Sequence, residues 1–191
     1  MTTILRINSS ARTDDSVSRE LTDRLIARFD DAQVVDRDLS NGVAQLSADT
    51  LAAMRVPADQ RTEAQQTELA DADTFIDELV SADAVVICLP IYNFGPPASM
   101  EAWADPVARA GTTFRYTENG PEGLVESKPV YVIVASGGVP VGSGADFAST
   151  WLTTFLGFLG LTDVTSVAAE QLNVDPERAV TSARESVDAV A

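Results

Sequence analysis

The chain has 191 residues, of which 45% are hydrophobic, and this length and composition predict one domain covering residues 1–191. Its 29 acidic residues outnumber 13 basic ones, and the net charge of −16 disfavours binding to nucleic acid or to anionic membranes. There is no histidine and Cys88 is the one cysteine, so the composition argues against a zinc site, a Cys/His nucleophile pair and an internal disulfide.

Five apolar segments predict β-strands, and they alternate with amphipathic segments that predict helices. The expected strands are residues 3–7, 33–39, 84–89, 129–135 and 163–168. The expected helices begin at Ser16, at 63, near 99, at 146 and at Asp175-Pro176, where the residue types suit an N-cap and the first helical position. The inner strands are apolar on both faces, as in a parallel sheet covered on both sides. This α/β alternation predicts a flavodoxin-like, doubly wound sheet of five parallel strands in the order 2-1-3-4-5, with helices on both faces.

Three other segments carry weaker signals. Residues 40–62 mix polar, glycine and apolar positions, and we expect a helix only at 48–54. Pro106 lies inside the helical pattern that starts near residue 99 and should kink or break that helix. Residues 111–124 contain Asn119-Gly120 and predict either a long loop or a β-excursion with a tight turn. No apolar run of about 20 residues and no leader pattern are found, so we expect a cytoplasmic protein without a membrane anchor.

Loops 8–18, 90–97 and 135–144 follow three of the predicted strands and should face one cleft, because ligands of open α/β sheets bind at the carboxyl edge. The first loop offers the hydroxyls of Ser10 and Ser16 beside a helix start, which together suit an anion. Arg12 could close on the same anion. Alternatively, Ser16 only caps the helix. The loop lacks the glycine spacing of a dinucleotide or ATP site, so a monophosphate is the better interpretation.

The other two loops suit a flat ring with polar edges. Asn93 can donate and accept hydrogen bonds, and Tyr92 and Phe94 offer stacking area, although these aromatics could equally just cover the core. The glycines after Ser136 would let the backbone approach a ligand, or form an ordinary turn. The sequence shows no acid/base pair, and Ser143 between two glycines is not a nucleophile elbow. We therefore expect a cofactor, rather than a protein side chain or a metal, to carry the chemistry.

Three motifs resemble the FMN-dependent NADH:azoreductase and quinone reductase family. They are Pro-Ile-Tyr-Asn-Phe at 90–94, the long block at 107–124, and residues 154–161. The resemblance covers nearly the whole chain. It implies a flavodoxin-like homodimer with shared active sites that binds FMN non-covalently. It also implies ping-pong transfer of two electrons from NADH or NADPH to quinones and aromatic azo compounds.

The resemblance also assigns site residues by position in this chain. The FMN phosphate would be held by Ser10, Ser16, Val17 and Ser18. The flavin ring would be contacted by Ile91, Tyr92, Asn93, Phe94, Ala135, Ser136, Gly137 and Gly138. Tyr116 and Phe158 match aromatics against which substrate stacks, at least one of them from the partner subunit. Ser136 stands where some relatives have a bulkier basic residue. Arg55, Arg61, Arg109 and Arg115 are candidates to receive the anionic nicotinamide nucleotide, or else form surface ion pairs.

Other functions stay open on the residues alone. The chain could be a flavodoxin-like electron-transfer module without substrate turnover, an NADPH-dependent reductase of FMN or metal ions, or a structural protein without a flavin. Tyr116, Trp151 and the long 111–124 segment favour an enzyme over a carrier, because an electron carrier needs an exposed flavin edge rather than a covered pocket.

Overall fold

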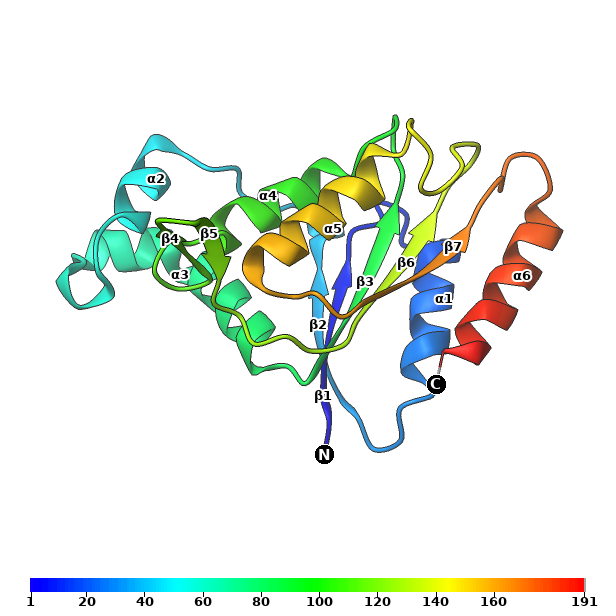
Figure 1. Cartoon of the computed structure of the whole chain (residues 1–191), viewed down its shortest axis with the longest axis horizontal. Helices are drawn as coiled ribbons and strands as arrows, with labels where there is room; N and C mark the ends of the chain where they lie inside the picture. The colour runs from blue at the N-terminus through cyan, green and yellow to red at the C-terminus, as the bar shows by residue number, and fades with distance from the viewer. Residues whose placement is uncertain (191) are drawn as a thin grey trace.

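Five parallel strands form a single sheet in the order β2-β1-β3-β6-β7, in a computed structural model that describes residues 1–190 (Figure 1). The strands are β1 (Thr3–Asn8), β2 (Gln33–Asp38), β3 (Ala84–Pro90), β6 (Val130–Ala135) and β7 (Val164–Ala169). This is the predicted 2-1-3-4-5 order, because β4 and β5 belong to a separate hairpin. The predicted strand 33–39 ends one residue early, at Asp38, where a 3-10 turn over Leu39–Asn41 begins.

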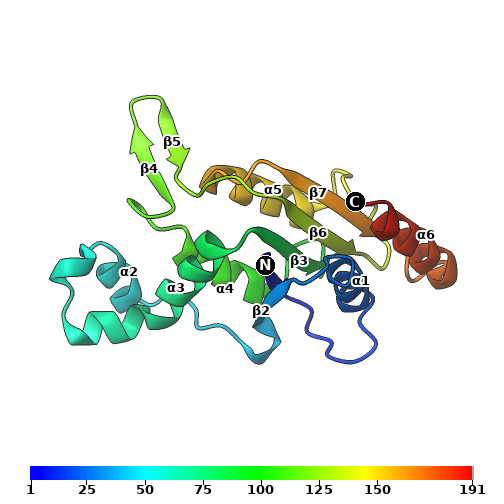
Figure 2. The ribbon, with the colours of Figure 1, turned by 90° about the horizontal axis from the view of Figure 1, so that it is seen from below.

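Helices cover both faces of the sheet, as predicted (Figures 1 and 2). Helices α1 (Val17–Ile26) and α6 (Pro176–Ala189) lie on one face, where Leu21, Leu25 and Val187 pack against Ile4 and Val86. On the other face lie α3 (Glu63–Ser81), α4 (Ala98–Val107) and α5 (Phe147–Leu159), around a larger core that contains the fully buried Trp103. Two packed cores on a fully buried central strand explain why β3 is apolar throughout.

Local sequence signals account for most helix ends. Ser16 caps α1 by accepting a hydrogen bond from the Arg19 N–H, and Asp175 with Pro176 opens α6 as predicted. The predicted helix at 48–54 is α2 (Ala48–Met54), which packs on α3. Pro106 stands in the last turn of α4, and the helix ends one residue later, which confirms the expected break. None of the helices within residues 1–190 is both long and apolar enough to cross a bilayer.

Residues 114–123 form the hairpin expected as one alternative for the 111–124 segment. Strands β4 (Phe114–Thr117) and β5 (Gly120–Gly123) pair antiparallel and project away from the sheet, beside the C-terminal end of α5 (Figure 2). The base of the hairpin is held against that helix end, where the Val125 N–H donates to the Leu159 carbonyl at 3.0 Å.

The strand register places three loops at one edge of the sheet. Asn8 is level with Cys88, and Pro90 is level with Ala135. Parallel pairing continues for one residue past the strand ends, since the Ile91 N–H donates to the Ala135 carbonyl at 2.9 Å. The N-terminus and the end of α6 lie at the opposite edge (Figure 1). The loops after β1, β3 and β6 therefore share the carboxyl edge of the sheet.

Candidate functional site

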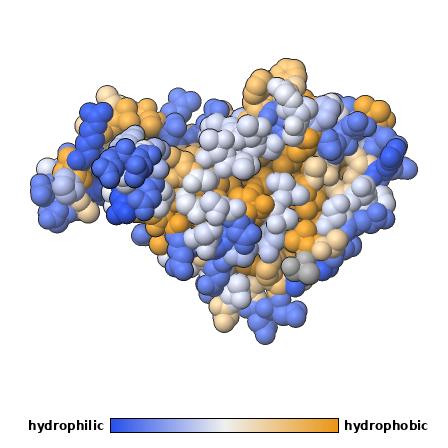
Figure 3. Space-filling model, viewed as in Figure 1, coloured by the Kyte–Doolittle hydropathy of each residue, from blue (hydrophilic) through white to orange (hydrophobic). Residues whose placement is uncertain are grey.

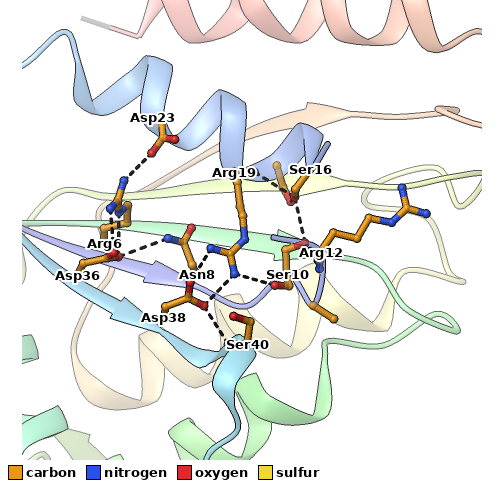
Figure 4. Close-up of polar contacts among 12 residues, drawn as sticks. Arg6, Asn8, Ser10, Arg12, Ser16, Arg19, Asp23, Asp36, Asp38 and Ser40 are labelled. Atoms are coloured by element: carbon orange, nitrogen blue, oxygen red, sulfur yellow. Dashed lines mark hydrogen bonds and ion pairs between the residues drawn. The ribbon is translucent and has the colours of Figure 1, made fainter. Parts of the chain in front are cut away.

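Three serine hydroxyls meet between the end of β1 and the start of α1, and we call Ser10, Ser16 and Ser18 the serine cluster. Figure 4 shows Ser10 and Ser16 of this cluster. The Ser16 hydroxyl lies 3.0 Å from that of Ser10 and 3.3 Å from that of Ser18. Ser10 and Ser18 are almost fully buried. Val17 and Ser18 occupy the first turn of α1, whose N–H groups have no partner within the helix. Hydroxyls and free N–H groups at the positive end of a helix dipole form a site for a compact anion.

Arg19 fixes the loop that carries the serine cluster, but its charge is already neutralised. Its guanidinium donates to the Asp38 carboxylate at 2.7 and 2.8 Å and to the Ser10 carbonyl at 2.8 Å (Figure 4). The hydrogen bonds from Arg19 hold the pKa of Asp38 well below its usual range. The pair therefore orients Ser10 and contributes little net positive charge to an anion bound beside it.

A pocket of about 280 Å³ opens beside the serine cluster, between the loops at the carboxyl edge, and we call it the loop pocket. The predicted residues that line it are Ser10, Ser16, Val17, Ser18, Ile91, Tyr92, Ala135 and Gly137. Arg12 and Asp15 line it as well. The structure therefore brings together residues from all three predicted loops. A second hollow of about 200 Å³, between the 42–46 segment and α3, has neither the serine cluster nor the β3 and β6 loops in its walls.

Asn93 and Phe94 lie at the tip of the second loop rather than in the pocket wall. The Tyr92 and Gly95 backbones exchange two 3.0 Å hydrogen bonds, so Asn93 and Phe94 are the central residues of a tight turn. Both have left-handed backbones, with φ of 48° and 74°. Such a conformation is unusual for a bulky residue and is found preferentially at functional sites. Phe94 is 53% exposed. The Tyr92 hydroxyl accepts from the Ala11 N–H at 3.2 Å and so joins the second loop to the first.

Ser136 and Gly138 also lie outside the pocket wall, and Ser136 has an evident local role. It is buried, and its hydroxyl accepts from the Val139 N–H at 2.8 Å, which closes the turn after β6. Gly137 faces the pocket. A Cβ atom on Gly137 would lie 2.5 Å from the Asn173 side-chain nitrogen, so a larger residue here would have to displace the Asn173 amide.

A fourth loop completes the pocket, and the sequence reasoning missed it. Leu172 and Asn173, between β7 and α6, line the pocket. Their N–H groups donate to the Ser136 and Gly137 carbonyls at 3.1 and 2.9 Å. A polar loop after the last strand could have been suspected from the carboxyl-edge rule alone, but no motif marks these two residues.

Tyr116 and Phe158 do not line the loop pocket of their own chain. Both pack on Phe114, with ring centroids 5.3 and 4.4 Å away, at the end of α5 that holds the hairpin. Tyr116 is 76% exposed.

The arginines considered for a nicotinamide nucleotide are mostly engaged elsewhere. Arg61 and Arg109 both pair with Asp73, and Arg115 pairs with Glu122 at 2.9 Å, so the ion-pair alternative holds for these three. No ion pair involves Arg55 within residues 1–190. Over the same residues, no cluster of three or more acidic or cysteine side chains is arranged to hold a metal ion.

Comparison with known proteins decides the family. The profile of a family described by its flavodoxin-like fold matches residues 2–191. An FMN-dependent NADH:quinone oxidoreductase from Jannaschia sp. is 50% identical over 191 residues, which cover all of both chains. This chain belongs to the FMN-dependent NADH:quinone oxidoreductase family. Another relative of that name, from Hahella chejuensis, is 46% identical, with 99% of this chain and 95% of the relative covered.

Solved structures of azoreductases are similar to the structure of this chain. An azoreductase from Bacillus anthracis (strain Sterne) superposes with a TM-score of 0.89 at 28% identity, covering 100% of this chain and 98% of the other. An FMN-dependent NADH-azoreductase from the Ames Ancestor strain, in complex with FMN, gives a TM-score of 0.87 at 25% identity, with 99% and 97% covered. Both comparisons confirm the resemblance inferred from residues 90–94 and 107–124, and the predicted flavodoxin-like fold.

Proposed function

We propose that this chain is an FMN-dependent NADH:quinone oxidoreductase that also reduces aromatic azo compounds. The observation that carries the proposal is the loop pocket, in which an anion site and an apolar, glycine-containing wall meet at one sheet edge. Full-length relatives of that name at 46–50% identity support the same activity. A cytoplasmic location fits the proposal, because reduced nicotinamides are supplied there.

The residues present fit FMN. The serine cluster and the first turn of α1 match a terminal phosphate, and Ile91, Tyr92, Ala135 and Gly137 offer apolar surface and close backbone approach to a flat ring. FMN, when bound, supplies the two-electron chemistry, accepting a hydride from NADH and passing two electrons to the acceptor. The protein positions the flavin and the substrate in a pocket that partly excludes water, which explains why it needs no acid/base pair or nucleophile of its own.

The predicted ring contacts outside the pocket wall keep roles in this proposal. Asn93 and Phe94 sit at the rim on a turn held by the Phe147 N–H, which donates to the Phe94 carbonyl at 2.9 Å. We assign them contacts with the exposed side of the ring. Ser136 and Gly138 act by shaping the turn that presents Ala135 and Gly137.

We further propose a homodimer in which the partner completes each site. Helix α5 contains no charged residue, although 22% of the chain is charged. One side of α5 has a stripe of aromatic residues that is only partly buried. The stripe runs toward the hairpin that carries Tyr116. The stripe consists of Phe147, Trp151, Phe155 and Phe158. In Figure 3 this side shows apolar and neutral surface over α4 and α5, whereas strongly hydrophilic surface gathers near α2 and α3. A second copy seated there would cover the stripe and could bring Tyr116 to the other subunit's pocket.

The purified protein tests the proposal directly. It should be yellow, release FMN on denaturation and oxidise NADH with a quinone acceptor in the steady state. An electron carrier would bind FMN without turnover, and a reductase of FMN or metal ions would prefer those acceptors to quinones. A colourless protein that refuses added FMN would overturn the proposal. A monomer by light scattering would overturn only the dimer.

A further inference from the structure

Almost every cation of this acidic chain is already engaged, and Arg12 is an exception. Lys128, the single lysine, donates to three backbone carbonyls at the end of α3. Nine arginines form ion pairs: Arg6, Arg19, Arg24, Arg28, Arg37, Arg61, Arg109, Arg115 and Arg184. Among residues 1–190, that leaves Arg12, Arg55 and Arg178 outside any ion pair.

Of these three arginines, Arg12 alone lines the loop pocket. Its backbone N–H donates to the Ser10 hydroxyl at 3.3 Å, which ties the residue to the serine cluster. Its side chain is exposed and extends away from Ser10 and Ser16, with no contact drawn to its guanidinium (Figure 4). A long side chain anchored at its root and free at its tip can fold over a ligand seated on the cluster.

The charges around the loop pocket make a positively charged side chain necessary for binding a phosphate. A phosphate monoester carries nearly two negative charges and would enter a protein whose net charge is −16. The neighbouring guanidinium of Arg19 is neutralised by Asp38. Asp15, held in the left-handed conformation with φ of 53°, also lines the pocket and adds a repulsive charge. The serine hydroxyls carry no charge, so the helix dipole and Arg12 are the remaining sources of positive potential in the pocket wall.

We infer that Arg12 closes over the phosphate of FMN and makes the site selective for FMN over riboflavin, with Asp15 opposing it. The inference rests on the proposed function. A guanidinium can make two parallel hydrogen bonds to a phosphate, which a serine cannot match. Riboflavin has the same ring and no phosphate, so it separates this role from ring binding.

The test is a titration of flavin-free protein with FMN and with riboflavin, followed by flavin fluorescence. Arg12→Gln should raise the Kd for FMN by about 10-fold to 100-fold and leave the Kd for riboflavin within about twofold. The FMN affinity of this variant should also depend less on salt than that of the parent. Asp15→Asn tolerates the same backbone and should tighten FMN by roughly two- to fivefold, with no effect on riboflavin. Arg178→Gln removes the same charge outside the loop pocket and is the matched control, with unchanged affinity for both flavins.

Two results would overturn the inference. One is an Arg12→Gln protein, folded by circular dichroism, that binds FMN as tightly as the parent. The other is an equal loss of FMN and riboflavin. If the parent protein binds neither flavin, the proposed function itself fails. If the parent binds FMN and the Arg12→Gln variant binds it equally well, only the role of Arg12 is refuted.

Discussion

Replacing Gly123 with alanine should loosen the hairpin from α5 and destabilise the whole chain. A Cβ atom at this position would lie 2.2 Å from the Gly160 nitrogen, 2.2 Å from the Leu159 carbonyl carbon and 2.4 Å from the Leu159 oxygen. All three are backbone atoms of the end of α5, so no side chain can rotate away. Gly160 itself is fixed as the left-handed residue that ends the helix, with φ of 104°.

The hairpin or the helix end must therefore shift by roughly 1.2–1.8 Å to restore an ordinary contact. That shift would break the 3.0 Å hydrogen bond from the Val125 N–H to the Leu159 carbonyl and disturb the packing of the tilted Phe114 and Phe158 rings. Overpacking costs about 1–3 kcal/mol and a lost hydrogen bond about 1 kcal/mol, so the free energy of unfolding should fall by about 3 kcal/mol. For a chain of this length, Tm should fall by roughly 6–12 °C.

Thermal unfolding followed by circular dichroism, without flavin, measures this effect. Gly157→Ala is the control, because the space around Gly157 is open and alanine favours a helix, so stability should rise by up to about 1 kcal/mol. A Gly123→Ala protein that melts within about 2 °C of the parent would refute the reasoning. Since Gly123 lies outside the loop pocket, FMN should still bind, while dimerisation and quinone turnover should fall if the hairpin reaches the partner.

Three further changes probe the site and its supports. Ser18→Asp should weaken FMN binding by at least about 100-fold, because a buried carboxylate would face the phosphate; undiminished affinity would remove the anion site. Asp38→Asn should cost about 2 kcal/mol at neutral pH by leaving Arg19 unpaired. Because hydrogen bonds from Arg19 lower the folded-state pKa of Asp38, its stabilisation is complete above the unfolded-state pKa of about 4 and is lost as the pH falls through the folded value. Urea unfolding at neutral and acid pH should therefore show the two proteins converging in acid, and a constant gap would contradict this role. Cys88 is fully buried and burial raises the pKa of its thiol, so a thiol reagent should label it only after unfolding; immediate labelling of the folded protein would show that the strand opens.

Most of the fold was predictable because local and long-range signals agree. The uninterrupted apolar run at 84–89 predicts a buried parallel strand, and β3 is buried along its whole length. The short helix expected at 48–54 is also present, and the structure shows what starts it, a capping box between Ser47 and Thr50. Parallel pairing then carries the strand ends to one edge, which is why loops separated by 80 residues in sequence could be predicted to meet.

The parts of the site that escaped prediction depend on contacts that no local pattern encodes. Asn173 reaches the pocket only because its backbone bonds to Gly137 across the sheet edge. Asn93 and Phe94 stay predicted ring contacts, but the sequence did not indicate the tight turn with two left-handed residues that places them at the rim. The sequence placed Arg12 beside the anion site, but it could not show that Arg109 is buried in an ion pair with Asp73. That pairing depends on how the segment after α4 packs on α3.

Both described ends of the chain lie away from the loop pocket, since the first residue and the end of α6 are at the opposite edge of the sheet (Figure 1). A tether to an electrode or bead, or a fused reporter, can therefore be attached at either end without covering the loop pocket. Immobilised in this way, the protein would keep the loop pocket open to the solution, so flavin uptake by the Arg12 and Asp15 variants can be followed on one surface.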